Sequence, residues 1–291
     1  MFNLFKYELK RAFSTKSTYV IIAFFILFTL LPILGGYFTI QTSEDSSLLK
    51  AMASDSEEQF EEEFYKENDK NADIEGLRKQ AVEKNYNFEE ISKNIAGNGV
   101  ATLMLTIFAS IAATKEYTSG YIKNLITNRN YRKKMPFAKL FIILIFAIIL
   151  LILTVIIYTL ASSILTGNLS IDWSKLLLYS GQYLLAVLAF SSILILIANL
   201  TSNITATVTT SILLVQGILS PFISMFDDLK ILPFKLLDYS LVQNLSKTHM
   251  GLSYNDLAEM AKSLVPIALV YLVVFTVLNL IVLDKKDINL G

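Results

Sequence analysis

The chain has 291 residues, of which 54% are hydrophobic and only 17% are charged. Soluble globular chains are about 25% charged, so this composition argues against an ordinary soluble domain. The formal net charge of zero gives no bias toward nucleic acid, and no nucleic-acid partner is expected. The absence of Cys excludes disulfides and Cys-ligated metals, and the single His argues against a His-based metal site or a His-dependent triad.

Two long stretches, 140–171 and 176–226, contain no Asp, Glu, Lys or Arg. A membrane span needs about 20 mostly apolar residues, so the first stretch can hold one long helix and the second can hold two. A core helix of a soluble protein would keep a polar stripe, and these stretches show none. We therefore predict an all-α polytopic membrane protein with six transmembrane helices, an N-terminal interfacial helix and a helical extracellular insertion.

Residues 1–17 form a short basic amphipathic segment. Phe2, Phe5, Leu9 and Phe13 recur at helical spacing, and the charged side chains fall mostly on the other faces. This pattern favours a helix lying in the membrane interface, with a soluble cap on the protein as the alternative.

The first span is predicted at 18–40 and is expected to be retained, because its apolar stretch is long and no small-x-small cleavage site follows it.

Residues 41–97 differ sharply in character from the spans. They contain 15 acidic and 7 basic residues, no Pro, and many good helix formers. We expect an acidic extracellular helical domain with a thin apolar core. The run Glu61, Glu62 and Glu63 is interpreted as a solvated face, with weak cation binding as the alternative.

The remaining elements follow in chain order. Asp172 is placed to cap the helix that follows it, and Trp173 to anchor that helix at the interface. The predicted order is a second span at 98–114, a cytoplasmic loop at 115–136, a third span at 137–166, a fourth at 175–198, a fifth at 206–223, an extracellular or re-entrant segment at 224–262, a sixth span at 263–283, and a tail at 284–291.

The distribution of basic residues sets the orientation. Cytoplasmic loops carry an excess of Lys and Arg. With six spans, three basic segments fall on one side of the membrane: Lys6, Lys10, Arg11 and Lys16; Lys115, Lys123, Arg129, Arg132, Lys133, Lys134 and Lys139; and Lys285 and Lys286. Both termini and 115–136 are therefore predicted to be cytoplasmic, with 41–97 and 224–262 outside.

No pattern of catalytic residues is present. The chain lacks GxxxxGK[ST], so it is not expected to hydrolyse nucleotide by itself. The spans hold no Asp pair for intramembrane proteolysis, and the lone His249 cannot supply a two-His metal site. We predict that the chain is not an enzyme and holds no catalytic residue and no metal.

Neutral polar residues are scattered through the spans, notably Gln182, Asn199, Gln216 and Asn279. Ion-coupled carriers usually hold Asp, Glu or Arg within the bilayer, and the predicted spans contain none of these, so energy for transport would come from elsewhere. Two interpretations of the four residues stay open. They make interhelical hydrogen bonds, or they line a pathway.

The segment 115–127 is short, amphipathic and flanked by positive charge. Tyr121, Ile122, Leu125 and Ile126 can form one apolar face at helical spacing. Glu116 is expected at the beginning of this helix, where the dipole favours an anion, free to cap it or to accept hydrogen bonds from a partner. Gly120 would allow another backbone to approach closely. The alternative is a helix that only rests on lipid.

The run Glu116-Tyr-Thr-Ser-Gly120, followed by Ile122-Lys-Asn-Leu125, resembles the E-Y-x-x-G-x-[IL]-K-N-L segment of type-2 ABC exporter permeases. The N-terminal helix and the closing Leu283-Asp-Lys-Lys-Asp-Ile288 are also similar to that family. The branch it resembles most is that of the bacitracin, lantibiotic and peptide-export permeases of Gram-positive bacteria. The acidic 41–97 segment departs from the short first outer loop expected there.

The resemblance implies a permease subunit of an ATP-driven exporter in the bacterial cytoplasmic membrane. Its coupling helix would contact a separate ABC ATPase, which would bind ATP and Mg, so no cofactor is expected in this chain. A second permease subunit, identical or paralogous, would complete the pathway for an amphipathic peptide, lantibiotic or hydrophobic drug. The alternative function is a non-transporting membrane sensor or scaffold whose outer domain binds a peptide. The residues implied as ATPase contacts are Lys115, Glu116, Tyr117, Thr118, Ser119, Gly120, Tyr121, Ile122, Lys123, Asn124 and Leu125.

Overall fold

The computed structural model describes residues 2–53, 74–96, 99–118, 129–167, 171–218, 220–229 and 235–285. In this part of the chain every regular element is a helix, so the all-α prediction is confirmed. In chain order the elements are α1 (Phe2–Phe13), α2 (Lys16–Thr42), α3 (Ser46–Ala53), α5 (Ile74–Asn85), α6 (Phe88–Ala96), α7 (Val100–Thr118), α9 (Arg129–Thr166), α10 (Trp173–Thr201), α11 (Ile204–Val215), α12 (Ser220–Asp228), the 3₁₀ helix η1 (Leu236–Tyr239), α13 (Leu241–Ser246) and α14 (Tyr254–Lys285).

Four of these helices are long and apolar enough to cross a membrane: α2, α9 from Lys133 onward, α10 and α14. A multi-pass membrane protein is thus supported, but the count of six spans is not confirmed. The predicted second span corresponds to α7, which has 19 residues and carries Lys115 and Glu116 in its last turn. The predicted fifth span is only partly helical as α11, which has 12 residues against the roughly 20 that a span requires.

A turn at Gly217 separates α11 from α12. Gln216 ends α11, and Gly217 adopts a positive φ of 65°, a conformation open to glycine at little cost. Pro221 then falls in the first turn of α12, where its missing N–H has no helical partner to lose. The helix predicted over 206–223 is therefore interrupted at Gly217.

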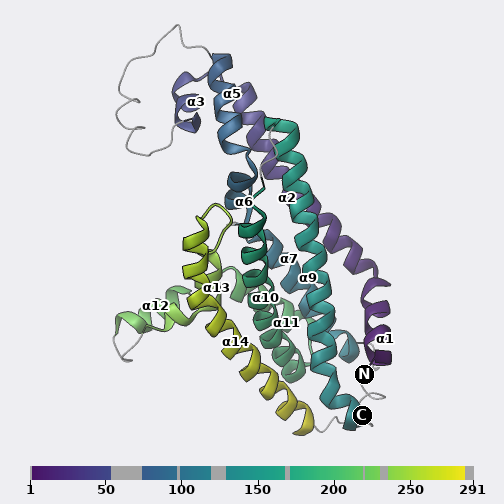
Figure 1. The fold of residues 1–291 in the computed structure, drawn as a ribbon. Coiled ribbons are helices and arrows are strands. Elements are labelled where there is room, and N and C mark those ends of the chain that lie inside the picture. Colours follow the sequence, from purple (N-terminus) through teal and green to yellow (C-terminus); the bar gives the residue numbers. More distant parts are fainter. Residues whose placement is uncertain are drawn as a thin grey trace.

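The helix α10 is the central element of the bundle and packs against α7, α9 and α14 (Figure 1). In the most apolar stretch of α10, 56% of the residues are buried, against 22% in α2 and 17% in α14. One core cluster joins α2, α7, α9 and α10, and in it the rings of Phe108 and Phe146 stack with centroids 3.7 Å apart. The outward faces of α2 and α14 remain apolar and exposed, as expected for lipid-facing helices.

The helices α3, α5 and α6 form a cap at the end of the bundle opposite α1 and the last turn of α14 (Figure 1). The cap is held by Arg78, whose Nη2 donates to the Ser43 carbonyl at 2.8 Å, and by an ion pair of 2.8 Å between Lys175 on α10 and Glu89 on α6. Tyr86 places its hydroxyl directly over Gly36 on α2. The described part of the acidic segment is thus helical, whereas Glu61, Glu62 and Glu63 lie outside the described residues.

Local capping at the start of α10 follows the prediction. Asp172 is the N-cap residue, and its carboxylate accepts hydrogen bonds from the backbone N–H groups of Ser174 at 2.9 Å and Lys175 at 3.2 Å. These bonds satisfy two of the free donors that every helix leaves at its beginning.

Candidate functional site: a polar cluster at the end of α7

The segment predicted to contact an ATPase begins inside α7. Lys115, Glu116, Tyr117 and Thr118 form the last turn of that helix. Ser119, Gly120, Tyr121, Ile122, Lys123, Asn124 and Leu125 lie outside the described residues. The expectation that Glu116 begins a separate helix is therefore wrong, because α7 continues through it. The role of the segment as an ATPase contact stays a prediction.

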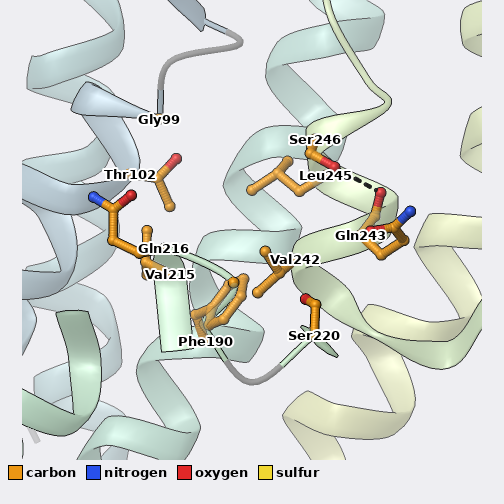
Figure 2. Close-up of a pocket in the computed structure, with 11 residues that line it drawn as sticks. Gly99, Thr102, Phe190, Val215, Gln216, Ser220, Val242, Gln243, Leu245 and Ser246 are labelled. Atoms are coloured by element: carbon orange, nitrogen blue, oxygen red, sulfur yellow. Dashed lines mark hydrogen bonds between the residues drawn. The ribbon is translucent and has the colours of Figure 1, made fainter. Parts of the chain in front are cut away.

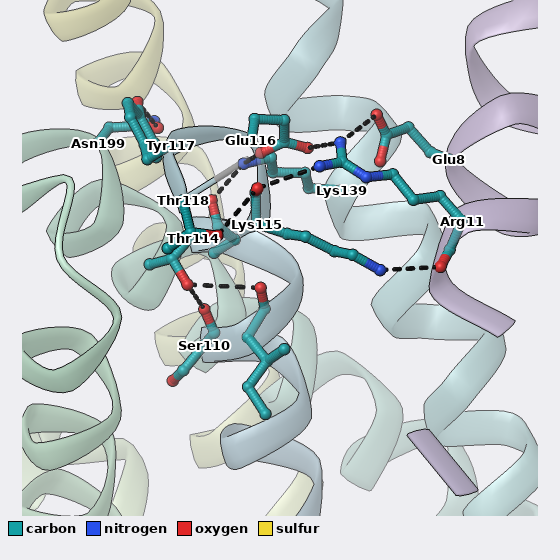
Figure 3. Close-up of polar contacts among 12 residues, drawn as sticks. Glu8, Arg11, Ser110, Thr114, Lys115, Glu116, Tyr117, Thr118, Lys139 and Asn199 are labelled. Carbon is teal, nitrogen blue, oxygen red and sulfur yellow. Dashed lines mark hydrogen bonds and ion pairs between the residues drawn. The ribbon is translucent and has the colours of Figure 1, made fainter. Parts of the chain in front are cut away.

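Glu116 is fully buried and is paired within the chain. One carboxylate oxygen forms an ion pair with Nζ of Lys139 on α9, and the other lies 3.9 Å from Nη1 of Arg11 on α1 (Figure 3). Lys139 is itself 2% exposed, and its ammonium also donates to the Ala113 carbonyl on α7. A buried charge is tolerated only when it is paired, so Glu116 and Lys139 each require the other.

A second set of contacts ties α1 to the same turn. Arg11 donates from Nη2 to the Lys115 carbonyl at 3.0 Å, and Lys115 donates from Nζ to the Arg11 carbonyl at 2.9 Å. Arg11 also lies 3.9 Å from the carboxylate of Glu8, one helical turn earlier. The interfacial helix is thus fixed to the end of α7 by reciprocal charge-assisted hydrogen bonds.

Glu8 is the one carboxyl of this cluster that lies on α1. Burial, and next the neighbouring charge of Glu116, raise the pKa of Glu8 to about 7, against the opposing effects of Lys139 and Arg11. The two carboxyl groups are close enough to share a hydrogen bond when one of them is protonated. The cluster therefore changes its charge near neutral pH.

On its other side, the last turn of α7 is linked to α10 and α14. The Tyr117 hydroxyl donates to Oδ1 of Asn199 at 2.8 Å, and Nδ2 of Asn199 donates to Oδ1 of Asn279 at 2.7 Å. Asn279 donates in turn to the Ser192 carbonyl on α10 at 2.9 Å. We call Glu8, Arg11, Lys115, Glu116, Tyr117, Lys139, Asn199 and Asn279 the α7 cluster; it joins α1, α7, α9, α10 and α14.

Three of the four neutral polar residues singled out in the spans make hydrogen bonds between helices, and the fourth lies in the wall of a cavity. Asn199 and Asn279 are buried and make interhelical hydrogen bonds, and Gln182 on α10 donates to the Leu257 carbonyl on α14 at 3.0 Å. Gln216 instead lines a cavity of about 360 Å³. The pathway interpretation stays a prediction for all four.

The cavity at Gln216 lies between the beginning of α7, the middle of α10, the end of α11 and the segments α12 and α13 (Figure 2). Its wall mixes apolar side chains such as Phe190 and Val242 with neutral polar ones such as Gln243 and Ser246. None of the described residues that line it is charged, so the cavity suits a molecule with both apolar and hydrogen-bonding groups better than it suits an ion.

Sequence reasoning missed the internal partners of Glu116. The sequence analysis used Arg11 and Lys139 only as basic residues that indicate the orientation in the membrane. It gave Glu8 no role beyond that of a charged residue on the first helix. A signal was available for Lys139, because it stands two residues inside an otherwise apolar run, where a charge is expected to find a buried partner. Nothing in the sequence specified that the partner lies 23 residues away on α7.

Comparison with known families adds an independent observation. Residues 77–220 match the model of the ABC-2 family transporter protein family. The matched range runs from α5 to the first residue of α12, and includes all of α7, the segment 119–128 and α9. No curated protein matches the chain. The family match supports the membrane permease of an ABC transporter, a transport component that is not itself catalytic.

Proposed function

On the premise that residues 77–220 form an ABC-2 transporter domain, we propose that this chain is the permease subunit of an ATP-driven exporter. The family match is the observation that carries the proposal, because the family couples a membrane component to an ABC ATPase. The ATPase would be a separate chain that binds ATP and Mg. A second permease, identical or paralogous, would complete the pathway across the bacterial cytoplasmic membrane.

The geometry of the α7 cluster supports a role for residues 115–127 in coupling. The segment 119–128 leaves α7 directly after the turn that holds Glu116 and Tyr117. Through these two side chains and Lys115 that turn contacts α1, α9 and α10, and Asn199 extends the contact to α14. A displacement of the segment by an ATPase would therefore act on several helices together, as rigid-body switching of a pathway requires.

The cavity at Gln216 supports an amphipathic cargo, such as a peptide, lantibiotic or hydrophobic drug. Its lining offers apolar surface together with neutral donors and acceptors, from Phe190, Val242 and Gln243 among others. Such a wall can release its ligand, because none of its described residues carries a charge that would hold a counter-ion in place. Export is the proposed direction, with both termini and 115–136 in the cytoplasm.

The second candidate function is a non-transporting sensor or scaffold. The observation that favours it is the folded cap of α3, α5 and α6, whose Leu49, Val82 and Ile91 belong to an apolar cluster that also includes residues of α2, α9 and α10. A sensor would need no ATPase, so the two functions differ in whether an ATPase binds the chain.

Affinity purification of the intact chain from its native membrane tests the proposal. We expect a partner chain that contains a P-loop sequence and no membrane span to co-purify in near-stoichiometric amount. Recovery of the chain with other membrane or outer partners, and with no ATPase, would favour the sensor and contradict the exporter.

A further inference from the structure

The exposed face of α1 carries cations and no anion. Lys6, Tyr7 and Lys10 recur at helical spacing and are exposed. Glu8, the only acidic residue of the chain before Glu44, is buried on the opposite face of the helix, within the α7 cluster. Neither Lys6 nor Lys10 forms an ion pair with any described residue. The positive charge of this face is therefore not compensated within the described part of the chain.

Lys16 continues the same charge into the first turn of α2. It is exposed, and it precedes Val20 by one turn and Phe24 by two turns, both of which are exposed as well. Because residues four apart lie on the same side of a helix, Lys16 stands at the end of the apolar row that α2 turns outward. A phospholipid has the same order of groups, a charged phosphate followed by apolar chains. We call Lys6, Lys10 and Lys16 the α1 basic surface.

The α1 basic surface lies at the end of the bundle opposite the cap (Figure 1). The orientation predicted from the basic segments puts this end in the cytoplasm. Anionic lipids give the cytoplasmic leaflet a negative surface potential, which attracts lysines beside a span and is screened by salt. Charge complementarity, together with the exposed apolar row that begins beside the lysines, favours a lipid as the occupant over a protein.

The opposite face of α1 is bound to the segment proposed for coupling. Arg11 and Lys115 exchange hydrogen bonds at 3.0 and 2.9 Å, and Lys115 belongs to the turn of α7 from which the segment 119–128 departs. A headgroup held on the outer face of α1 would therefore act, through Arg11, on the position of that turn.

We propose that the α1 basic surface binds the phosphate group of an anionic phospholipid of the cytoplasmic leaflet, whose acyl chains lie along the exposed apolar row of α2. The bound lipid stabilises α1 against the bundle and, with it, the contact between α1 and α7. Lipid binding requires this chain alone and goes beyond the proposed function. Only the effect of the lipid on coupling rests on that function.

Photolabelling of the purified full chain in phosphatidylcholine nanodiscs tests the proposal, with a phosphatidylglycerol that carries a diazirine in one acyl chain as the probe. We expect adducts on residues 16–24, and competition by unlabelled phosphatidylglycerol that weakens as salt is raised. Changing Lys6→Gln, Lys10→Gln and Lys16→Gln together keeps the side-chain length and removes the charge. This triple variant should lower the apparent affinity for phosphatidylglycerol roughly tenfold or more. Competition by added phosphatidylcholine as strong as that by phosphatidylglycerol would overturn the proposal.

Two further triple variants separate the surface from net charge and from misfolding. Lys79→Gln, Lys235→Gln and Lys262→Gln remove the same charge from exposed positions on α5, beside η1 and on α14, and should leave the labelling unchanged. Arginine at positions 6, 10 and 16 keeps the charge and should keep the labelling. An equal loss in both glutamine variants would contradict a local site.

The test also distinguishes a lipid from a protein on this surface. If the glutamine variant at positions 6, 10 and 16 keeps wild-type labelling but loses a co-purifying ATPase, the surface is a protein contact and the lipid proposal is wrong. Because the labelling uses the chain without an ATPase, its result does not depend on whether the exporter proposal holds.

Discussion

Arg11 and Lys115 each donate a side-chain hydrogen bond to the backbone carbonyl of the other, at 3.0 and 2.9 Å, although 104 residues separate them. This reciprocal pair fixes the interfacial helix α1 to the turn of α7 from which the segment 119–128 departs. The buried Glu116 and Lys139 lie beside it. The arrangement gives the α7 cluster both a structural function and, under the proposed mechanism, a route for motion from an ATPase to the spans.

The buried ion pair gives the first prediction. Glu116→Gln leaves Lys139 charged and without its counter-ion, so we expect a loss of about 3–5 kcal/mol in stability. The measurement is the unfolding free energy in detergent titrated with denaturant. The matched change, Glu89→Gln, breaks a more exposed pair with Lys175 and should cost no more than about 1 kcal/mol. Equal losses in the two variants would show that Glu116 is not buried with Lys139.

The double variant Glu116→Gln with Lys139→Met removes both charges of the buried pair. Because replacing a whole buried pair by neutral groups of similar volume is often neutral, much of the lost stability should return. A double variant that loses the full sum of the two single effects would contradict a direct interaction between the two residues.

Glu8 predicts a pH dependence. Folding raises the pKa of its carboxyl from 4.5 to about 7, mainly by burial and then by the charge of Glu116, so the folded chain binds this proton more tightly than the unfolded chain. The stability contributed by Glu8 is therefore fully present below pH 4.5 and is lost as the pH rises through about 7. Thermal unfolding midpoints measured between pH 5 and 8 should fall with pH in the wild type and vary less in Glu8→Gln. An identical slope in both proteins would contradict the assignment.

The hydrogen bonds that run from Tyr117 through Asn199 to Asn279 predict losses of stability of different size. Tyr117→Phe removes one hydroxyl and should cost about 1 kcal/mol of stability. Asn279→Val removes the bond to Asn199 and two donations to the carbonyls of Ser192 and Phe275, leaving buried groups unpaired, so its cost should be clearly larger. Unfolding free energies of the two variants check the order, and the reverse order would contradict the network.

The contact between the cap and α2 predicts a pair of opposite outcomes at adjacent glycines. A Cβ at Gly36 would lie 2.5 Å from the Tyr86 hydroxyl, whereas a Cβ at Gly35 meets no atom within 4 Å. Gly36→Ala should therefore loosen the cap, and Gly35→Ala should be neutral or slightly stabilising because Ala favours helix by about 1 kcal/mol over Gly. Limited proteolysis of residues 74–96 reports the difference, and Tyr86→Phe should restore protection to Gly36→Ala.

The sequence predicted the helical class and the capping role of Asp172, because hydropathy and a single cap residue are local patterns, and its short motif resembles the type of transporter that the family match over residues 77–220 supports. It did not predict the break between α11 and α12, because the break depends on the positive φ at Gly217 rather than on hydropathy. It also did not predict the burial of Glu116, since the charge pairs with Lys139 only through the packing of α7 on α9. A lone carboxylate next to a basic loop has the same sequence pattern whether it faces water or a buried ammonium. The hydrogen-bond partners of Asn199 and Asn279 could not be predicted either, because the sequence pattern does not show which helices face one another.

Gly120 gives a functional prediction for the segment that follows the α7 cluster. Gly120→Trp should release the ATPase during purification or uncouple ATP hydrolysis from transport, because a large side chain would hold the two surfaces apart. Gly35→Trp makes the same chemical change at an exposed position of α2 and should retain the ATPase. Full association and transport in Gly120→Trp would contradict the coupling role.

The central claim is that residues 115–127 are the contact through which a separate ATPase drives this chain. Site-specific photo-cross-linking in native membranes tests it most directly, with benzoylphenylalanine replacing Tyr121 and, as the matched control, replacing the exposed Tyr254 at the start of α14. The account predicts an adduct from position 121, and none from position 254, to a chain with a P-loop and no membrane span. Adducts to lipid alone from position 121, in membranes where that ATPase is present, would contradict it.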